Sequence, residues 1–315
     1  VTIIDGGMNK RCVFVRTQET ELTVFEGLTF RNGYAQHGAG MWTSNSTPLV
    51  IDCVFLNNWS YGWGGGLYVS ATASPTLKDC VFTNNQALDG GAVKNYGNDP
   101  VFINCSFSGN NADNGGAVQN YARGATFTNC SFTANEAAVS GGAIHNVFGS
   151  YPDFNNCIID GNTAVNGGGI RNEASSVSVF TDCDIFNNVA TAGGGIENHN
   201  SSPSFVGCEI KFNVGQDVGG MLSLLKSNPS LLNSTVCENA LMNIEGPFSD
   251  LGGNTICSDL ACDSDFNGDA VVNIEDLLQL IAAWDNGGGA EDLDGDGNVG
   301  VNDLLILIAA WGDCP

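Results

Sequence analysis

Residues 104–118 read NCSFSGNNADNGGAV, and closely related stretches return along the chain every 25 to 27 residues. In each copy a cysteine is followed two residues later by Phe or Ile, five residues later by Asn, and then by a glycine pair. The cysteines are Cys53, Cys80, Cys105, Cys130, Cys157, Cys183 and Cys208. A fixed period of this length is typical of a solenoid, in which every repeat forms one coil.

The residues within each repeat predict β-coils. Residues 100–107 and 125–132 alternate apolar and polar positions and are rich in β-formers, whereas the connections are rich in Gly, Asn and Ser. A repeat of this length divides into three short strands, which make one coil of a parallel β-helix. About nine such coils in residues 1–250, each rising roughly 4.8 Å, would give a rod on the order of 45 Å long.

Stacked coils place equivalent residues in columns. We expect the Phe, Ile and Cys columns to point inward, the Asn column to bond between coils, and the glycine pairs to form tight corners. In the first full copy Leu28 takes the cysteine position. The column just before the cysteines is expected to form a polar ladder, and it consists of Asp52, Asp79, Asn104, Asn129, Asn156, Asp182 and Gly207.

A mixed column follows the glycine corner. It contains Lys94, Gln119, His145, Arg171 and Glu197. This mixture predicts a solvated face with a contact between Arg171 and Glu197, so that Phe107 is expected to be buried and Lys94 exposed. The three histidines of the chain fall at different coil positions, so no metal site or catalytic triad is expected from them.

The pattern Cys-x-Phe-x-x-Asn followed by Gly-Gly-Ala-Ile/Val resembles the repeat of the chlamydial polymorphic outer-membrane proteins. It is also similar to the repeats of many secreted bacterial right-handed β-helix proteins. The resemblance covers residues 28–222. It implies an all-β, right-handed parallel β-helix over residues 1–257 and a surface-exposed or secreted rod, acting as an adhesin or a structural element.

The composition changes after Cys257. Residues 258–315 contain 13 acidic residues and no Lys or Arg, so they carry −13 of the net charge of −24. They also contain a duplication, because DLLQLIAAW at 276–284 is nearly repeated as DLLILIAAW at 303–311. Each copy has the apolar spacing of an amphipathic helix and follows an acidic loop.

Both acidic loops have the spacing of calcium ligands. Calcium takes six to eight oxygen ligands, which a curled loop of this kind can supply. The first loop offers the side chains of Asp265, Asn267, Asp269, Asn273 and Asp276 and the carbonyl of Val271. The second offers the side chains of Asp292, Asp294, Asp296 and Asp303 and the carbonyl of Asn298. The turn position is Gly297 in the second loop but Ala270 in the first. The sequence therefore predicts two calcium ions.

Paired loops of this form, each with Asp at its last ligand position and one helix, resemble a type I dockerin over roughly residues 263–313. The resemblance implies a small α-helical module that folds with calcium and docks to a cohesin or a similar partner. It also implies that the ends of the module meet, which makes Cys262 and Cys314 a candidate disulfide. The alternative is a structural calcium module that packs on its own solenoid or on a neighbouring subunit.

The other cysteines have several possible states. An oxidising, extracellular location is expected from the surface-type solenoid and the calcium loops. The seven column cysteines lie one per coil, and we expect buried free thiols, with occasional bridges between coils as the alternative. Cys237 and Cys257 form a second candidate disulfide, which would close the last coil.

Aromatic residues crowd the first coils. Trp42, Trp59, Tyr61 and Trp63 are candidates for a protein interface, with simple turn packing and glycan binding as alternatives. The chain starts directly in a coil pattern, so we expect either further coils before it or pairing of this end with another molecule. Basic residues near the start, Lys10, Arg11, Arg16 and Arg31, oppose the acidic end and favour head-to-tail self-association.

These patterns favour an extracellular, non-catalytic β-helix rod at a bacterial surface, with a structural, filament-forming or adhesive role and a calcium-dependent docking module. The alternative is a glycan-binding or polysaccharide-cleaving β-helix carried into a larger assembly by its dockerin. Cleavage needs clustered carboxylates facing basic residues. Only Asp52 and Asp79 are adjacent acids in their column, and no Lys or Arg column faces them. A charge of −24 argues against nucleic-acid binding, and no stretch is long enough to span a membrane.

Overall fold

The computed structural model describes residues 2–70, 72–257, 264, 266–267, 271–284, 289, 291–293, 297–309 and 311–313. The chain divides into two units, Val1–Cys257 and Ser258–Pro315. The division falls after Cys257, where the composition of the sequence changes. Among the described residues, no helix is long and apolar enough to cross a membrane.

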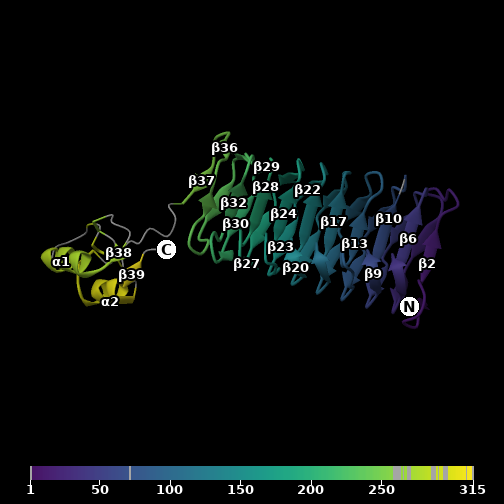
Figure 1. Cartoon of the computed structure of the whole chain (residues 1–315), viewed down its shortest axis with the longest axis horizontal. Coiled ribbons are helices and arrows are strands. Elements are labelled where there is room, and N and C mark those ends of the chain that lie inside the picture. Colours follow the sequence, from purple (N-terminus) through teal and green to yellow (C-terminus); the bar gives the residue numbers. More distant parts are fainter. Residues whose placement is uncertain are drawn as a thin grey trace. The chain divides into compact units, whose positions relative to one another are not determined.

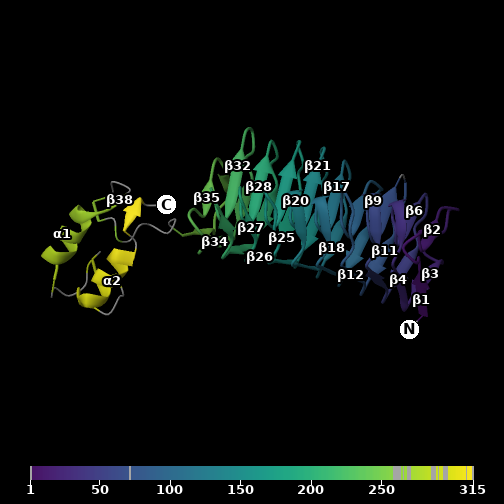
Figure 2. The same ribbon diagram turned by 60° about the horizontal axis from the view of Figure 1, so that its bottom comes forward.

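Three parallel sheets, called A, B and C, run along the first unit, and each coil contributes one strand to each sheet (Figures 1 and 2). Sheet A contains, in order, β1 (Thr2–Asp5), β4 (Leu28–Arg31), β8 (Val54–Leu56), β12 (Val81–Thr83), β15 (Ser106–Ser108), β19 (Ser131–Thr133), β23 (Ile158–Asp160), β26 (Asp184–Phe186), β30 (Glu209–Lys211), β34 (Thr235–Cys237) and β37 (Thr255–Ile256). The expected number of about nine coils is close to the ten or eleven strands in each sheet.

The other two sheets follow the same order of coils. Sheet B contains β2 (Val13–Val15), β6 (Met41–Ser44), β10 (Leu67–Ser70), β13 (Val93–Asn95), β17 (Val118–Tyr121), β21 (Ile144–Val147), β24 (Ile170–Glu173), β28 (Ile196–His199), β32 (Met221–Leu224) and β35 (Ile244–Glu245). Sheet C contains β3 (Val24–Glu26), β7 (Leu49–Ile51), β11 (Thr76–Lys78), β14 (Val101–Ile103), β18 (Thr126–Thr128), β22 (Asp153–Asn155), β25 (Val179–Thr181), β29 (Ser204–Val206), β33 (Ser230–Leu232) and β36 (Ser249–Asp250).

Short parallel pairs form at the corner before sheet B. They are β5 (Tyr34–His37) with β9 (Trp59–Trp63), β16 (Asn111–Asn114) with β20 (Glu136–Ser140), and β27 (Val189–Ala190) with β31 (Val214–Gly215). The glycine pair comes directly after this corner. A Cβ on Gly116 would lie 2.1 Å from the carbonyl oxygen of Gly142 in the next coil, which leaves no room for a side chain.

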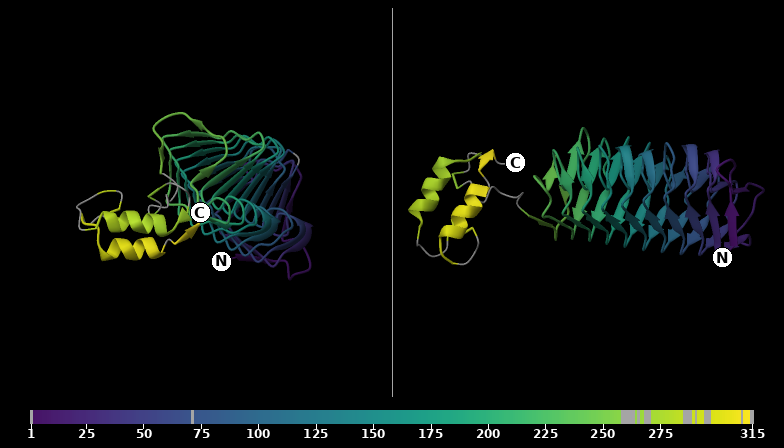
Figure 3. Two further views of the ribbon diagram at one scale, coloured as in Figure 1. Left: turned by 60° about the vertical axis from the view of Figure 1, so that its left-hand side comes forward. Right: turned by 90° about the horizontal axis from the view of Figure 1, so that it is seen from below.

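The coils stack one on another along the solenoid (Figure 3), and strand pairing in register aligns their inward side chains in columns. Phe82 lies opposite Phe107 in the next coil, with ring centroids 5.0 Å apart, and Phe107 lies 4.8 Å from Phe132. A second row of stacked rings comes from sheet C, where Phe102 and Phe127 are 4.7 Å apart. Phe107 is fully buried, as predicted, and Leu28 does align with Cys53, because their neighbours Thr29 and Val54 are paired.

The predicted Asn ladder is present and is fully satisfied. The backbone N–H and the side-chain amide of Asn85 both donate to Oδ1 of Asn110, at 3.0 Å, and the same amide donates to the carbonyl of Phe55 at 2.9 Å. A second buried ladder, which the sequence did not predict, runs along the inner side of sheet B. In it Asn120 donates to Asn146 at 2.9 Å, and Asn146 donates to Asn172 at 3.0 Å.

The column before the cysteines forms a ladder on the surface. Asp79, Asn104 and Asn129 have left-handed backbones with φ of 53°, which Asp and Asn tolerate best among residues with side chains. Asn104 donates to Asp79 at 3.0 Å, and Asn129 donates to Asn104 at 3.1 Å. The side chains therefore bond to each other between coils, which agrees with a structural reading of this column.

The described part of the C-terminal unit contains β38 (Val271–Val272), α1 (Ile274–Ala282), α2 (Val301–Ala309) and β39 (Gly312–Asp313). The two strands pair antiparallel. Among the described residues, the buried apolar cluster of this unit contains Val272, Leu280, Val299 and Leu307. Leu280 and Leu307 occupy equivalent positions of the duplicated sequence, so the two helices use the same residue to form the core.

Candidate functional site

The mixed column of sheet B is covered, which corrects the prediction of a solvated face. Strand alternation does turn Lys94, His145 and Glu197 away from the solenoid core, and the register aligns them in one row. Their exposed fractions are nevertheless only 3%, 4% and 2%. Residues at the corner before the strand and just after it close over the row, so the polar residues form a second, outer layer of packing.

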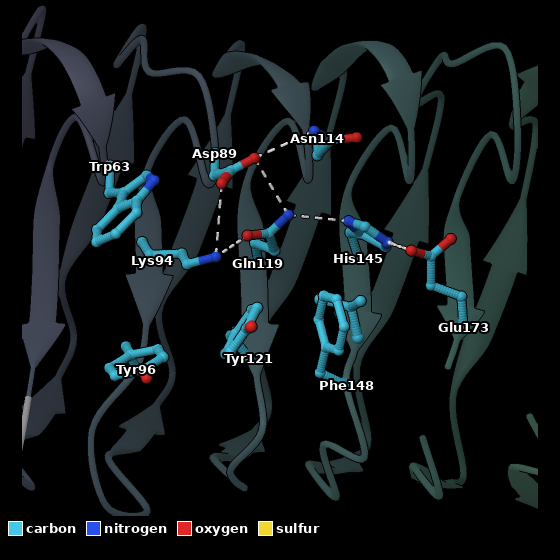
Figure 4. A pocket seen from close by; sticks show the side chains of 11 residues that line it. Trp63, Asp89, Lys94, Tyr96, Asn114, Gln119, Tyr121, His145, Phe148 and Glu173 are labelled. Atoms are coloured by element: carbon cyan, nitrogen blue, oxygen red, sulfur yellow. Dashed lines mark hydrogen bonds and ion pairs between the residues drawn. The ribbon is translucent and has the colours of Figure 1, made fainter. Parts of the chain in front are cut away.

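These residues surround a groove with a volume of about 510 Å³. Figure 4 shows Lys94, Gln119 and His145 side by side in the floor of the groove. One wall is formed by Trp63, Asp89 and Asn114, and the other by Tyr96, Tyr121 and Phe148, with Glu173 at the end of the row. Val147 also lines the groove. The groove therefore runs across five successive coils.

A continuous set of polar contacts holds the floor. Lys94 Nζ lies 3.6 Å from Asp89 Oδ2 and donates to Gln119 Oε1. Because an ammonium group only donates, this contact identifies the oxygen of the Gln119 amide, and its Nε2 must donate to His145 Nδ1, 3.0 Å away. His145 Nδ1 is then an acceptor, and the proton of the neutral ring lies on Nε2.

Beyond His145, the polar contacts of the row involve the carboxylates of Glu173 and Glu197. His145 Nε2 lies 3.5 Å from Glu173 Oε1, which is too long for a well-formed hydrogen bond. Arg171 bridges the next coils, with Nε 3.0 Å from Glu173 Oε2 and Nη2 3.7 Å from Glu197 Oε1. The predicted contact between Arg171 and Glu197 is thus confirmed, although within a buried row.

Burial and pairing set the charges of the row. Burial lowers the pKa of Lys94 to about 8, against the opposing effect of Asp89, and it also lowers the pKa of His145. The nearby His145 and Arg171 lower the pKa of Glu173, whereas burial raises that of Glu197. At neutral pH the floor therefore contains opposed charge pairs and a neutral histidine.

An exposed aromatic row lines one wall of the groove. The ring centroids of Tyr96 and Tyr121 are 5.2 Å apart, and those of Tyr121 and Phe148 are 4.8 Å apart. Phe148 is 58% exposed and has a left-handed backbone with φ of 57°, which is unusual for a bulky residue. This row was not predicted from the sequence. The signal was present, because these three residues recur at the coil period.

The four predicted interface aromatics are divided between two places. Trp63 stacks on His37, with centroids 4.6 Å apart, and lines the groove. Trp42 stacks on Phe14 at 4.5 Å and is half-buried in the first part of the same outward column. Trp59 and Tyr61 are exposed and lie against Tyr34 instead.

The structure contains the Cys237–Cys257 disulfide, one of the two candidate pairings. The seven column cysteines are buried free thiols. Burial raises the pKa of the Cys53 thiol, and its Sγ donates to the carbonyl of Ile51 at 3.2 Å, so this thiol behaves as a small core residue. Cys262 and Cys314 lie outside the described residues.

The acidic loops of the C-terminal unit show the same local arrangement twice. Asp276 is buried and accepts from the N–H of Phe266 at 2.8 Å and of Asn273 at 2.9 Å. The equivalent Asp303 is buried and accepts from Leu293 and Gly300, both at 2.7 Å. Each carboxylate therefore closes the loop that precedes its helix.

The remaining loop ligands are described in part. Asn273 caps α1, accepting from Glu275 N–H at 2.7 Å, and its amide donates to the Val271 carbonyl at 3.1 Å. Asp292 accepts from Gly297 N–H through Oδ2, while its buried Oδ1 has no hydrogen-bond partner within the described parts of the chain. Asn267 and Asn298 are described, whereas Asp265, Asp269, Asp294 and Asp296 lie outside the described residues.

Two family models match the solenoid. The right handed beta helix region matches residues 15–132, and the Chlamydia polymorphic membrane protein repeat matches residues 129–147. A search of curated proteins finds no match. Together with the three parallel sheets, the two matches identify a right-handed parallel β-helix repeat protein and confirm this part of the expected resemblance. Neither matched region extends into residues 258–315, so the resemblance to a dockerin stays a prediction.

Proposed function

We propose that this chain is a bacterial surface β-helix protein of the structural or adhesive kind, which joins a partner through a calcium-dependent C-terminal module. The match to the Chlamydia polymorphic membrane protein repeat supports a surface location. The proposal of a calcium-dependent C-terminal module is supported mainly by one observation, the closure of two equivalent loops by Asp276 and Asp303. Two loops that follow one plan, each with a buried carboxylate at its last ligand position, fit two equivalent ion sites.

The residues of these loops fit calcium. Oxygen ligands predominate in both loops, and a buried carboxylate oxygen without a partner, Asp292 Oδ1, is the type of atom that a hard cation would bind. Each carboxylate oxygen has more than one acceptor site, so Asp276 and Asp303 can hold the loop N–H groups and still face an ion. Bound calcium would offset the concentrated negative charge and tie each loop to its helix.

The two helices also offer a surface for a protein partner. Leu278 and Ile281 of α1 are exposed, and so are the equivalent residues Leu305 and Ile308 of α2. Small soluble units rarely leave several large apolar side chains on one pair of helices without a use for them. We infer an apolar contact with a cohesin-like protein, made by one or both of these helix faces.

End-to-end association of the rod remains a second partner hypothesis, but the basic residues support it less than expected. Arg31 is already paired with Asp5 at 2.8 Å. Arg11 donates to the carbonyls of His37 and Gly38 and lies over the Trp42 ring, with the guanidinium carbon 4.8 Å from its centroid. These charges mainly hold their own coils together.

Calorimetric titration of the full chain with calcium tests the metal sites. We expect two ions to bind, and the double variant Asp276→Ala/Asp303→Ala to lose both. Asp79→Asn, which changes a carboxylate on the surface of the solenoid, is the matched control and should bind calcium as the natural chain does. Unchanged calcium binding by the double variant would contradict the proposal.

The docking surface is tested separately with immobilised type I cohesin domains. We expect binding in calcium that chelation abolishes and that Leu278→Lys/Leu305→Lys weakens at least tenfold. The same variant should still bind calcium, because these side chains lie outside the loops. Absence of any calcium-dependent binding would rule out a cohesin-like partner and leave the structural-module reading.

A further inference from the structure

The groove on the outer face of sheet B has a rigid polar floor, an exposed aromatic wall and a length of several coils. None of these features is needed for docking through the C-terminal unit. We propose that the groove binds a neutral oligosaccharide, which lies along the axis of the solenoid. This function is separate from the one proposed above and rests on different residues.

The dimensions suit a chain of sugar rings. The lining residues run from Trp63 to Glu173 across five coils, which corresponds to roughly 20 Å at the strand spacing of a parallel sheet. The length of one pyranose unit is close to this spacing, so successive rings would meet equivalent positions of successive coils. A chain of sugar rings therefore matches the repeat of the groove. A compact metabolite would contact only one or two coils.

The aromatic wall supplies the faces on which sugars stack. The C–H groups of a pyranose carry partial positive charge and meet the negative face of an aromatic ring favourably. Tyr96 and Phe148 are 47% and 58% exposed, and neighbouring rings of the row are tilted by about 40°, so part of each ring face is open. Phe148 keeps this exposure on a strained backbone, which points to a use other than folding.

The floor is ordered before a ligand arrives. Lys94, Gln119 and His145 are buried and bonded to one another, so their positions are set without the entropy cost of ordering them on binding. The carboxylates of Asp89 and Glu173, whose side chains are 25% and 27% exposed, remain accessible in the groove. Carboxylate oxygens accept hydrogen bonds from hydroxyl groups strongly.

The difference in exposure between the carboxylates and the cations of the row indicates which ligand charge the groove favours. The cations of the row, Lys94 and Arg171, are covered, with side-chain exposures of 4% and 13%, and each is paired with a carboxylate. An anionic sugar chain would therefore meet mainly Asp89 and Glu173 and be repelled, within a protein whose net charge is −24. A hydroxyl-rich ligand without charge fits both the stacking wall and the carboxylates.

A glycan array probed with the full chain in calcium, followed by titration calorimetry, tests this proposal. The soluble probes are cellotetraose, mannotetraose and xylotetraose, with tetragalacturonate as the anionic comparator. We expect neutral glycans to bind and tetragalacturonate to bind at least tenfold more weakly. Binding to no neutral glycan on the array, or equal binding of tetragalacturonate, would overturn the proposal.

Variants then locate the site. Phe148→Ala should weaken binding of the best neutral glycan about tenfold. Phe212→Ala is a close control, because Phe212 is also a half-exposed phenylalanine with a φ of 56° but lies outside the groove. Equal effects of the two changes would overturn the assignment to the groove. Calcium binding and docking should be unaffected in both variants, so this test does not depend on the C-terminal unit.

Discussion

The solenoid and the C-terminal unit differ in what stabilises them. Each coil of the solenoid is bonded to the next by strand pairing, by buried Asn ladders such as Asn85 with Asn110, and by stacked rings such as Phe107 on Phe132. The C-terminal unit has a small apolar cluster in its described part and an excess of carboxylates. Small domains with cores of this size usually need a metal or a disulfide.

The two units also treat charge differently. The solenoid pairs the charges of this polar row internally, as Lys94 with Asp89 and Arg171 with Glu173. Residues 258–315 contain 13 carboxylates and no Lys or Arg, which leaves their charge to be offset from outside. We therefore expect the solenoid to be stable by itself and the C-terminal unit to depend on calcium.

The largest single effect is expected in the core of the solenoid. Phe107→Ala should lower the free energy of unfolding by roughly 3–5 kcal/mol, because it leaves a cavity between stacked rings. Urea denaturation followed by fluorescence measures this loss, and it should be the same with calcium and with chelator. A loss that changed with calcium would mean that the two units are not independent.

A smaller effect is expected in the outer polar layer. Lys94→Ala should cost about 1–3 kcal/mol, because it removes the buried ammonium group that donates to Gln119 Oε1 and faces Asp89. This replaces the sequence-based expectation of about 0.5 kcal/mol, which held only for an exposed lysine. Lys78→Ala, at an exposed position of β11, should stay within about 0.5 kcal/mol. Equal costs for the two lysines would show that the row does not stabilise the coils.

The pH dependence of stability gives a related and finer test. Burial lowers the pKa of Lys94 to about 8 from its ordinary value of 10.5, so the unfolded chain holds more protons between these pH values. Stability of the natural chain should therefore gain from Lys94 as pH rises through this window. Denaturation at pH 7.5 and pH 10 should show this gain in the natural chain and in Lys78→Met. Its persistence in Lys94→Met would contradict the assignment.

The smallest effect is expected on the surface ladder. Asp79→Asn should change the free energy of unfolding by less than about 0.5 kcal/mol, because Asn is equally at home in a left-handed backbone and already occupies this position in later coils. Thermal denaturation would show a larger loss only if the Asp79 carboxylate had a role beyond the ladder.

The columns of the solenoid could be predicted from the sequence, but the groove could not. Residues equivalent to Cys105, Phe107 and Asn110 recur in every repeat. Because one repeat forms one coil, residues one repeat apart lie opposite each other in adjacent coils, and the sequence alone gives this register. The burial of Lys94 depends on side chains of the neighbouring coils, such as Trp63 at the corner and Tyr121 at the end of β17. Alternation along a single strand does not predict such contacts. The sequence-based prediction equated the outward orientation of Lys94 with solvent exposure. That prediction is wrong where side chains of neighbouring columns cover the outer face of a strand.

The C-terminal unit presents the opposite case. Its duplication and the spacing of Asp276 and Asp303 could be predicted from the sequence, and both carboxylates close equivalent loops in the structure. The exposure of Leu278 and Leu305 could not, because an apolar residue on a short helix can face either a core or a partner. Only the way in which the two helices pack shows whether such a residue faces the core or remains exposed.

Hydrogen exchange of the full chain, measured by mass spectrometry with calcium and with chelator, tests the contrast between the units most directly. Amides of α1 and α2 should be protected in calcium and should lose most of that protection when calcium is removed. Amides of the solenoid strands should exchange at the same rate in both conditions. Equal protection of α1 and α2 with and without calcium would contradict the account.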